Sequence, residues 1–417
     1  MKNTPSKTLG DKQGGIPKKL STESYKGVRD FFPADMAIEK KIFDIWRGVC
    51  EKYGYEEYGA SVLEPAELYR AKSGEEIVNE QTYTFIDRGE REVTLRPEMT
   101  PTVARMVAAR RRELTFPLRW YSIPNLFRYE NPQRGRLREH WQLNVDIFGV
   151  EGIEADVEII SVAYNIMKAF GAKDEDFCIR INSRHMIQKE IENLLDDKTS
   201  YPKAARLLDK KEKMSSEEFQ NEWSKISKKP FVINGVMARE RTNELQGKLT
   251  LLGIKNVMFY PFLMRGFDYY TDIIFEIFDT NQENRRALFG GGRYDNLTSL
   301  FGGDKIPAVG FGMGDVTMRD FLETHDLLKN LQIPTSADYY ICVVSPAEAD
   351  AATKIAEKLR AKGSRVAVDF SYKKIGDQIK NADKRGIPEI IVIGEDEAKN
   401  GIYKIKNLKT GEERNPE

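Results

Sequence analysis

The segment FRYENPQRGRLR, residues 127–138, joins two apolar stretches and decides how this part of the chain folds. The stretches on either side, residues 118–128 and 141–149, have the length and apolar character of β-strands. Two antiparallel strands joined by a polar connection of this length predict a loop that closes over a ligand.

Arginine is the dominant residue of this loop. Arg128 ends the first strand and would direct a planar, permanently charged group at the sheet face, where phosphate or carboxylate is the natural partner. Strict alternation would put Arg134, Arg136 and Arg138 on one side, aimed at an extended polyanion such as a triphosphate. The alternative interpretation is a surface hairpin with exposed arginines.

Three further segments combine glycine with polar groups: RGFDYYT (265–271), GGGRYDNL (290–297) and AVGFGMGD (308–315). The first follows an apolar strand, so its Arg and Tyr groups need polar partners, either a bound ligand or neighbouring groups within a turn. The second permits close approach of backbone to a ligand, or forms a flexible turn. The third matches neither the P-loop nor the dinucleotide-binding pattern.

Composition excludes several classes of protein. The chain has 417 residues, with 65 Lys plus Arg against 65 Asp plus Glu, which argues against a protein that coats nucleic acid through bulk charge. Three cysteines without a CxxC pair and only three histidines argue against a disulfide framework or zinc knuckle and favour a cytoplasmic location. No apolar run is long enough to span a membrane, and the N-terminus has no secretory signal.

The order of the predicted elements indicates an α+β protein. Residues 1–23 have the composition of a disordered basic tail. Residues 24–174 and 255–330 form one domain of helices and mostly antiparallel strands, interrupted by a Lys- and Glu-rich helical insertion at 175–254. Residues 331–336 are a linker. After it, alternating strands and helices over residues 337–417 predict a small α/β module.

Five segments, in order, resemble histidyl-tRNA synthetases, which are class II aminoacyl-tRNA synthetases. These segments are GVRDF (27–31), LRPEMTP (95–101), residues 128–142, RGFDYY (265–270) and GGRYD (291–295). The resemblance implies an antiparallel-sheet catalytic domain with a helical insertion and a C-terminal anticodon-binding module. That module, residues 337–417, is expected to be shortened at its C-terminus.

The resemblance also implies a role for individual residues. Arg265 and Arg128 would be catalytic, between the carboxylate and the α-phosphate. Histidine would be bound by Glu98, Met99, Thr100, Arg128, Gln142, Asp146, Arg265, Tyr269, Tyr270 and Tyr294. ATP would be bound by Arg128, Glu130, Arg136, Arg138 and His140.

The implied partners are histidine, ATP with Mg²⁺, and tRNA(His), with no membrane and with a second copy of the chain in a homodimer. The residues suit the reaction, because fixed guanidinium groups and Mg²⁺ offset the repulsion between a carboxylate and the α-phosphate. No residues are predicted as Mg²⁺ ligands.

Two positions depart from the family pattern. His140 stands where an aromatic residue usually stacks on adenine, and Thr317 stands where an arginine usually binds the γ-phosphate. Arg319 lies about 200° further around a helix and is not expected to replace that arginine. The alternative function is a catalytically idle, synthetase-like sensor of histidine or tRNA. Specificity for another amino acid of class II is a more remote alternative, because residues 265–270 resemble the motif that is specific to histidine.

Overall fold

The computed structural model describes residues 20–70, 81–211, 214–233, 235–264, 269–284, 286–331 and 333–416. The chain divides into two compact units, Met1–Leu331 and Gln332–Glu417. Most of the predicted basic tail lies outside the described residues, as does Arg265. No helix in these described ranges is long and apolar enough to cross a membrane.

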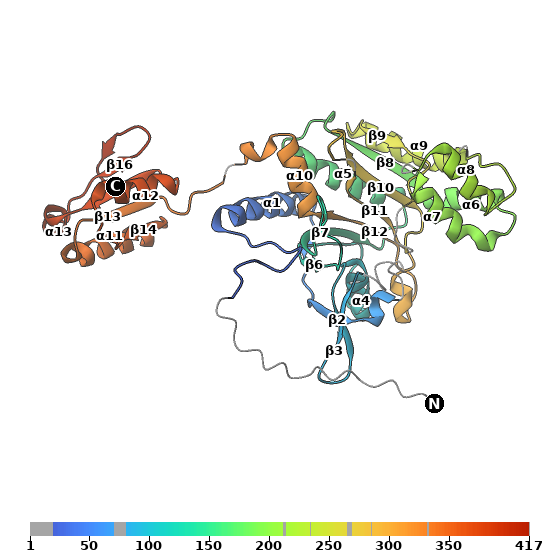
Figure 1. Cartoon of the computed structure of the whole chain (residues 1–417), viewed down its shortest axis with the longest axis horizontal. Helices are drawn as coiled ribbons and strands as arrows, with labels where there is room; N and C mark the ends of the chain where they lie inside the picture. Colours follow the sequence, from blue (N-terminus) through green and yellow to red (C-terminus); the bar gives the residue numbers. More distant parts are fainter. Residues whose placement is uncertain are drawn as a thin grey trace. The chain divides into compact units, whose positions relative to one another are not determined.

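The described part of the first unit is built on a nine-stranded sheet in the order β1-β5-β7-β12-β11-β10-β8-β9, with β6 paired to β7 (Figure 1). Neighbouring strands of this sheet run antiparallel, except for β1 with β5 and β8 with β9, which run parallel. The strands are β1 (Glu56–Glu57), β5 (Leu118–Ser122), β6 (Asn125–Phe127), β7 (Glu139–Phe148), β8 (Phe177–Ser183), β9 (Val257–Phe259), β10 (Ile273–Asp279), β11 (Ala287–Arg293) and β12 (Ala308–Gly314).

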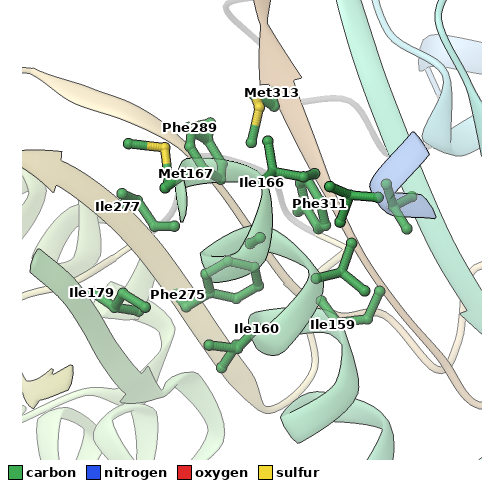
Figure 2. Close-up of a cluster of buried hydrophobic side chains, with 14 of the residues drawn as sticks. Ile159, Ile160, Ile166, Met167, Ile179, Phe275, Ile277, Phe289, Phe311 and Met313 are labelled. Atoms are coloured by element: carbon green, nitrogen blue, oxygen red, sulfur yellow. The ribbon is translucent and has the colours of Figure 1, made fainter. Parts of the chain in front are cut away.

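One face of this sheet is covered by helices. They are α1 (Pro33–Lys52), α5 (Ile153–Ala169) and α10 (Asp315–Thr324), followed by the short 3₁₀ helix η4 (Leu327–Asn330). Figure 2 shows isoleucines of α5 lying against Phe275 of β10 and Phe311 of β12, in a core whose side chains are almost entirely buried. Because alternate strand residues point to opposite faces, this apolar packing leaves the other face of the same strands available for polar groups.

A second, three-stranded sheet in the order β2-β4-β3 adjoins the main one. Its β3 (Tyr83–Ile86) and β4 (Glu92–Leu95) form the hairpin predicted from the sequence, and β2 (Leu63–Pro65) pairs with β4. Short α2 (Glu67–Arg70) lies between β2 and β3 in the chain, and α4 (Thr100–Arg110) follows β4. Pro101 lies in the first turn of α4, where its missing N–H costs nothing.

The expected helical insertion at 175–254 begins too early, because residues 177–183 form strand β8 of the main sheet. Apolar and polar residues alternate in FCIRINS, and this period of two identifies a strand. The helices that follow form their own core around Trp223 and Phe219. They are α6 (Arg184–Leu194), η1 (Lys198–Ser200), α7 (Tyr201–Asp209), α8 (Ser216–Ser224) and α9 (Val236–Leu251).

The second unit is a small α/β domain, as its alternating sequence predicted. Its sheet has the order β14-β13-β15-β16-β17, parallel at β14, β13 and β15 and antiparallel beyond. The strands are β13 (Tyr339–Val343), β14 (Val366–Asp369), β15 (Glu389–Ile393), β16 (Ile405–Asn407) and β17 (Glu413–Arg414). The helices are η5 (Pro346–Glu348), α11 (Ala349–Ala361), α12 (Ile375–Lys384) and α13 (Glu395–Asn400).

Candidate active site

A cavity of about 560 Å³ lies on the face of the main sheet opposite α5. The register of the strands explains why no side chains fill this cavity. Gly310 of β12 pairs with Asp146 of β7 and with Gly292 of β11, while Gly312 pairs with Asn144 and Gly290. Because these glycines have no side chains, bare backbone forms the floor beside the polar residues of β7.

One wall of the cavity comes from the turn between β4 and α4. Arg96 is buried and anchors this turn, since its guanidinium donates to the carbonyls of Ala60 (2.8 Å) and Asn125 (3.0 Å). The next residue, Pro97, accepts a hydrogen bond of 2.9 Å from Nε of Arg128. Arg128 is thereby held with its guanidinium at the cavity, beside Glu98.

A cluster of tyrosines forms an adjoining wall. The Tyr269 hydroxyl donates to Oε2 of Glu98 at 3.0 Å, and its ring meets the ring of Tyr294 edge-on, with centroids 5.9 Å apart. Tyr270 also lines the cavity, and its ring centroid lies 4.9 Å from that of Tyr269. The hydrogen bond from Tyr269 to Glu98 therefore joins residues that are 171 positions apart in the sequence.

Asp146 lies behind this wall. Its Oδ1 accepts a hydrogen bond from the hydroxyl of Tyr294, and the residue is only 3% exposed. Burial raises the pKa of Asp146 to about 7, against the opposing effect of the Tyr294 hydrogen bond. The carboxylate is therefore a buried acceptor that is separated from the cavity by Tyr294 and Gly310.

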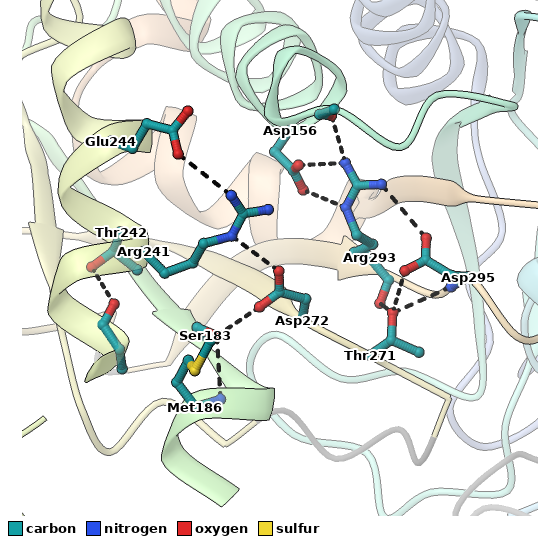
Figure 3. Close-up of polar contacts among 12 residues, drawn as sticks. Asp156, Ser183, Met186, Arg241, Thr242, Glu244, Thr271, Asp272, Arg293 and Asp295 are labelled. Carbon is teal, nitrogen blue, oxygen red and sulfur yellow. Dashed lines mark hydrogen bonds and ion pairs between the residues drawn. The ribbon is translucent and has the colours of Figure 1, made fainter. Parts of the chain in front are cut away.

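A buried ion pair supports the loop that carries Tyr294. Arg293 donates to Asp156 of α5 and to the carbonyls of Val150 and Gly152, each at 2.9 Å (Figure 3). The same network includes Asp295, which accepts from the Thr271 hydroxyl at 3.0 Å. Arg293 is 3% exposed and does not line the cavity, so its role is to fix the backbone beside Tyr294.

Most of the residues predicted from the sequence meet at this cavity. Those that line it are Glu98, Thr100, Arg128, Glu130, Arg136, His140, Gln142, Tyr269, Tyr270 and Tyr294. Burial, together with the positive charges of Arg128 and Arg29, lowers the pKa of His140 to about 3. His140 therefore presents a neutral imidazole ring, which suits stacking rather than charge pairing.

Met99, Arg138 and Asp146 do not line the cavity, and Arg265 lies outside the described residues. Met99 is 1% exposed, so its side chain is buried in the interior of the protein and does not reach the cavity. The predicted contact of Met99 with histidine is therefore not supported by the position of its side chain.

The predicted alternation of Arg134, Arg136 and Arg138 is wrong. A tight turn intervenes, with Gln133 and Arg136 exchanging backbone hydrogen bonds and Gly135 at a φ of +75°. Only Arg136 lines the cavity, paired with Glu130 at 3.0 Å.

Arg138 points elsewhere. Its guanidinium donates to the Glu130 carbonyl and the Tyr25 hydroxyl, and it stacks 4.0 Å from the ring centre of Tyr129. These partners occupy the side chain within the protein. The predicted contact between Arg138 and ATP is therefore not supported in this arrangement.

Sequence reasoning missed three charged residues that line the cavity: Arg180, Glu276 and Arg286. Arg180 and Glu276 face each other across the β8–β10 pair, so their position could have been found from strand alternation once β8 was recognised. Arg286 precedes β11 and donates to the side chain of Gln133 at 2.9 Å. No sequence signal distinguished Arg286, because it lies in an exposed turn.

The structure around α10 agrees with the prediction that Arg319 does not take the place of an arginine at position 317. Thr317 lines the cavity, but its hydroxyl donates to the Leu288 carbonyl at 2.6 Å and carries no charge. Arg319 does not line the cavity and pairs with Asp35 and Glu323. Arg319 therefore does not replace a cation at position 317.

Comparison with protein families matches residues 27–179 and 184–315 to the histidyl-tRNA synthetase model and residues 338–415 to the anticodon binding domain model. The chain belongs to the histidyl-tRNA synthetase family. A histidine–tRNA ligase of Leptospira biflexa is 43% identical over 94% of both chains. Another, of Thermoplasma volcanium, is 38% identical over 94% of this chain and 96% of its own.

Solved structures of the family share the fold as well. The apo histidyl-tRNA synthetase of S. aureus has a TM-score of 0.71 and 26% identity, covering 95% of this chain and 97% of its own. The family's catalytic domain and anticodon binding domain correspond to the two compact units of this chain. The histidyl-tRNA synthetase family therefore accounts for the architecture of nearly the whole sequence.

Proposed function

We propose that this chain activates histidine with ATP, forming histidyl-adenylate and pyrophosphate, and then transfers histidine to tRNA(His). The observation that carries the proposal is the presence of opposite charges at one cavity, which both Glu98 and Arg128 line. An amino acid needs an acceptor for its ammonium group and a cation for its carboxylate, and these two side chains supply both.

Histidine would bind with its ammonium group at Glu98 and Thr100 and its carboxylate at Arg128. Gln142 would add a polar contact, since its amide lies over Gly312 of the floor. The imidazole would then extend toward Tyr270, Tyr294 and the Asp146 carboxylate behind them. For Asp146 to accept a hydrogen bond from the imidazole N–H, Tyr294 would have to yield part of the space it fills.

ATP would occupy the side of the cavity formed by the 128–140 loop. His140 offers a neutral ring to the adenine, Glu130 an acceptor for its amino group, and Arg136 a cation for the phosphates. Arg286, on the facing turn, is a further cation near the same loop. This arrangement gives the triphosphate two guanidinium groups besides Arg128.

Mg²⁺ would arrive with ATP. Among the described residues no group of three or more His, Cys, Asp or Glu side chains could hold a metal ion by itself. Mg²⁺ bound to a nucleotide takes phosphate oxygens and water, and needs only one or two protein carboxylates. Glu276, which lines the cavity, is a suitable donor of this kind.

The chemical step requires charge stabilisation and no proton transfer. The histidine carboxylate attacks the α-phosphorus, the bond to the bridging oxygen breaks, and pyrophosphate leaves. Negative charge develops on the α-phosphate oxygens, and guanidinium groups fixed in advance stabilise it without reorganising. Arg128 is held in advance by Pro97, and Arg265 would act beside it.

The anticodon of tRNA would bind residues 337–417, and the loop around residues 131–134 would approach the acceptor end. We further propose that the chain works as a homodimer in the cytoplasm, where translation takes place. Sedimentation at several protein concentrations tests the dimer.

A pyrophosphate–ATP exchange assay separates the enzyme from the idle sensor. The enzyme exchanges label only when histidine is added, and Arg128→Ala abolishes most of this exchange. Arg365→Ala, which removes an exposed arginine paired with Asp338 in the second unit, is the matched control and should leave exchange unchanged. Histidine binding without exchange in the parent would support the sensor instead.

A further inference from the structure

Three polar atoms beside the candidate imidazole site are buried and make no hydrogen bond of normal geometry with the described residues. They are the hydroxyl of Tyr58, Oγ of Ser122 and Oδ2 of Asp146. A buried polar group without a hydrogen bond lowers the stability of the folded protein. Three such groups in one place therefore indicate a single hydrogen-bonding partner that they share.

Strand pairing brings these atoms to one face of the sheet. In the β5–β7 pair, Ser122 lies opposite Asn144, and Trp120 lies opposite Asp146. Tyr58 follows the last residue of β1, and its backbone N–H donates to the Tyr121 carbonyl at 2.8 Å, which continues the parallel β1–β5 pairing by one residue. Tyr58 and Ser122 therefore stand side by side on the face that carries Asp146.

The environment of Tyr58 on this face of the sheet includes Trp120, the residue that lies directly opposite Asp146 in the β5–β7 pair. Burial and then the negative charge of Asp146 raise the pKa of Tyr58 well above its usual value, whereas the neighbouring hydroxyl of Ser122, as a hydrogen-bonding group, and the positive charge of Arg96 oppose the shift. Its ring packs against Trp120, with centroids 5.7 Å apart. The hydroxyl is thus held toward the carboxylate rather than toward solvent.

One water molecule would satisfy all three atoms. A buried water makes two to four hydrogen bonds, and this site offers two hydroxyl groups and one carboxylate oxygen. The water would donate to Oδ2 of Asp146 and exchange its other hydrogen bonds with the two hydroxyl groups, each of which both donates and accepts.

We infer that Tyr58 and Ser122 hold a buried water against Oδ2 of Asp146 and so act as positioning residues of the imidazole site. The inference rests on the proposed role of Asp146 in binding histidine. Tyr294 fixes Oδ1 and the water fixes Oδ2, so the carboxylate cannot rotate away from the cavity. Oδ1 has a second acceptor position, which remains available to the imidazole N–H.

The test compares Tyr58→Phe, Ser122→Ala and the double variant with the parent in histidine-dependent exchange, using the full chain. Each single variant should raise the KM for histidine about 5- to 10-fold, the effect of losing one ordinary hydrogen bond. The kcat and the KM for ATP should stay within about twofold. Because both residues hold the same water, the double variant should resemble the worse single variant.

Tyr164→Phe is the matched control. Tyr164 lies on helix α5, and its hydroxyl donates a hydrogen bond of 2.7 Å to Asp174, which is not part of the candidate site. It should leave the KM for histidine unchanged. A crystal structure of the parent should contain an ordered water in contact with Tyr58, Ser122 and Asp146. If Tyr58→Phe does not fold, Ser122→Ala carries the same expectation.

An unchanged KM for histidine in a folded Ser122→Ala variant would overturn the inference. A parallel loss of ATP affinity and kcat would also overturn it, because that pattern indicates a general structural role. These outcomes leave the proposed function intact, since the parent still exchanges. A parent without histidine-dependent exchange would instead reject the proposed function, and the inference with it.

Discussion

Gly310 lies directly opposite Asp146 in the antiparallel pairing of β12 and β7. A Cβ atom placed on Gly310 would be 2.2 Å from Oδ1 of Asp146 and 2.6 Å from the Val145 carbonyl. The position of the buried carboxylate therefore depends on the absence of a side chain on the neighbouring strand.

Gly310→Ala should displace Asp146 and weaken histidine binding, because neither the carboxylate nor the β7 backbone can share the space of the new methyl group. We expect a loss of about 1–3 kcal/mol in binding free energy, as for a buried hydrogen bond lost. Calorimetric titration with histidine measures it. Gly48→Ala, in helix α1 with no atom within 4 Å of the added methyl, is the control. Equal affinities in parent and Gly310→Ala would contradict this placement of the pocket.

Asp146→Leu should lower histidine affinity by roughly 1–3 kcal/mol, because the imidazole N–H loses its acceptor. The same change should affect stability in the opposite direction. Burial raises the pKa of Asp146 to about 7, so the parent loses stability as pH rises from about 4 to about 7, because this carboxyl ionises in the unfolded chain while it stays protonated in the folded protein.

The Leu variant lacks this loss and should gain stability relative to the parent as pH rises from about 4 to about 7. Urea unfolding at each pH measures the difference. Asp146→Asn keeps an acceptor oxygen but cannot ionise, so it should retain more histidine affinity while showing the same pH effect. A pH-independent difference between parent and Leu variant would argue against a buried, titrating carboxyl.

Arg265→Ala should preserve histidine binding and reduce adenylate formation. A fixed cation at the developing charge of the α-phosphate is worth about 2–4 kcal/mol of transition-state stabilisation. Histidine-dependent exchange measures the rate, and calorimetry measures binding on the same sample. Exchange within twofold of the parent would show that Arg265 has no catalytic role.

Arg286→Ala should raise the KM for ATP at least about tenfold, because it removes one charge-assisted contact to the phosphates.

Arg319→Ala should leave the KM for ATP unchanged, since Arg319 pairs with Asp35 and Glu323 away from the cavity. Thr317→Arg should partly improve ATP binding by adding a cation at the cavity. A large ATP defect in Arg319→Ala would reverse the assignment.

Deletion of residues 335–417 should spare adenylate formation and abolish most transfer to tRNA. The apolar clusters of the second unit are made only of its own residues, so the core of the catalytic unit stays complete. Exchange and aminoacylation are measured in parallel. In the full chain, tRNA affinity should fall with salt as phosphate contacts are screened. Equal loss of both activities would indicate that the second unit supports the catalytic one.

Local patterns predicted the elements whose structure depends on nearby residues. The β3–β4 hairpin, the start of α4 at Pro101 and the alternating strands and helices after residue 337 all follow from period, turn residues and caps. Strand β8 was missed because charged segments on both sides of FCIRINS suggested a helical insertion. Its period of two was present, but the surrounding composition outweighed it.

The sequence by itself therefore determined most of the helices and strands and most of the residues that line the cavity, because helix periodicity, turns and ordered motifs are encoded locally. Only the tertiary structure decided which side chains face the cavity. Arg138 turns to Tyr25 and Tyr129, whereas Arg286 reaches the cavity from an exposed turn. The direction of a side chain at a sheet depends on strand register and on tight turns between strands, and neither is set by its immediate neighbours in the chain.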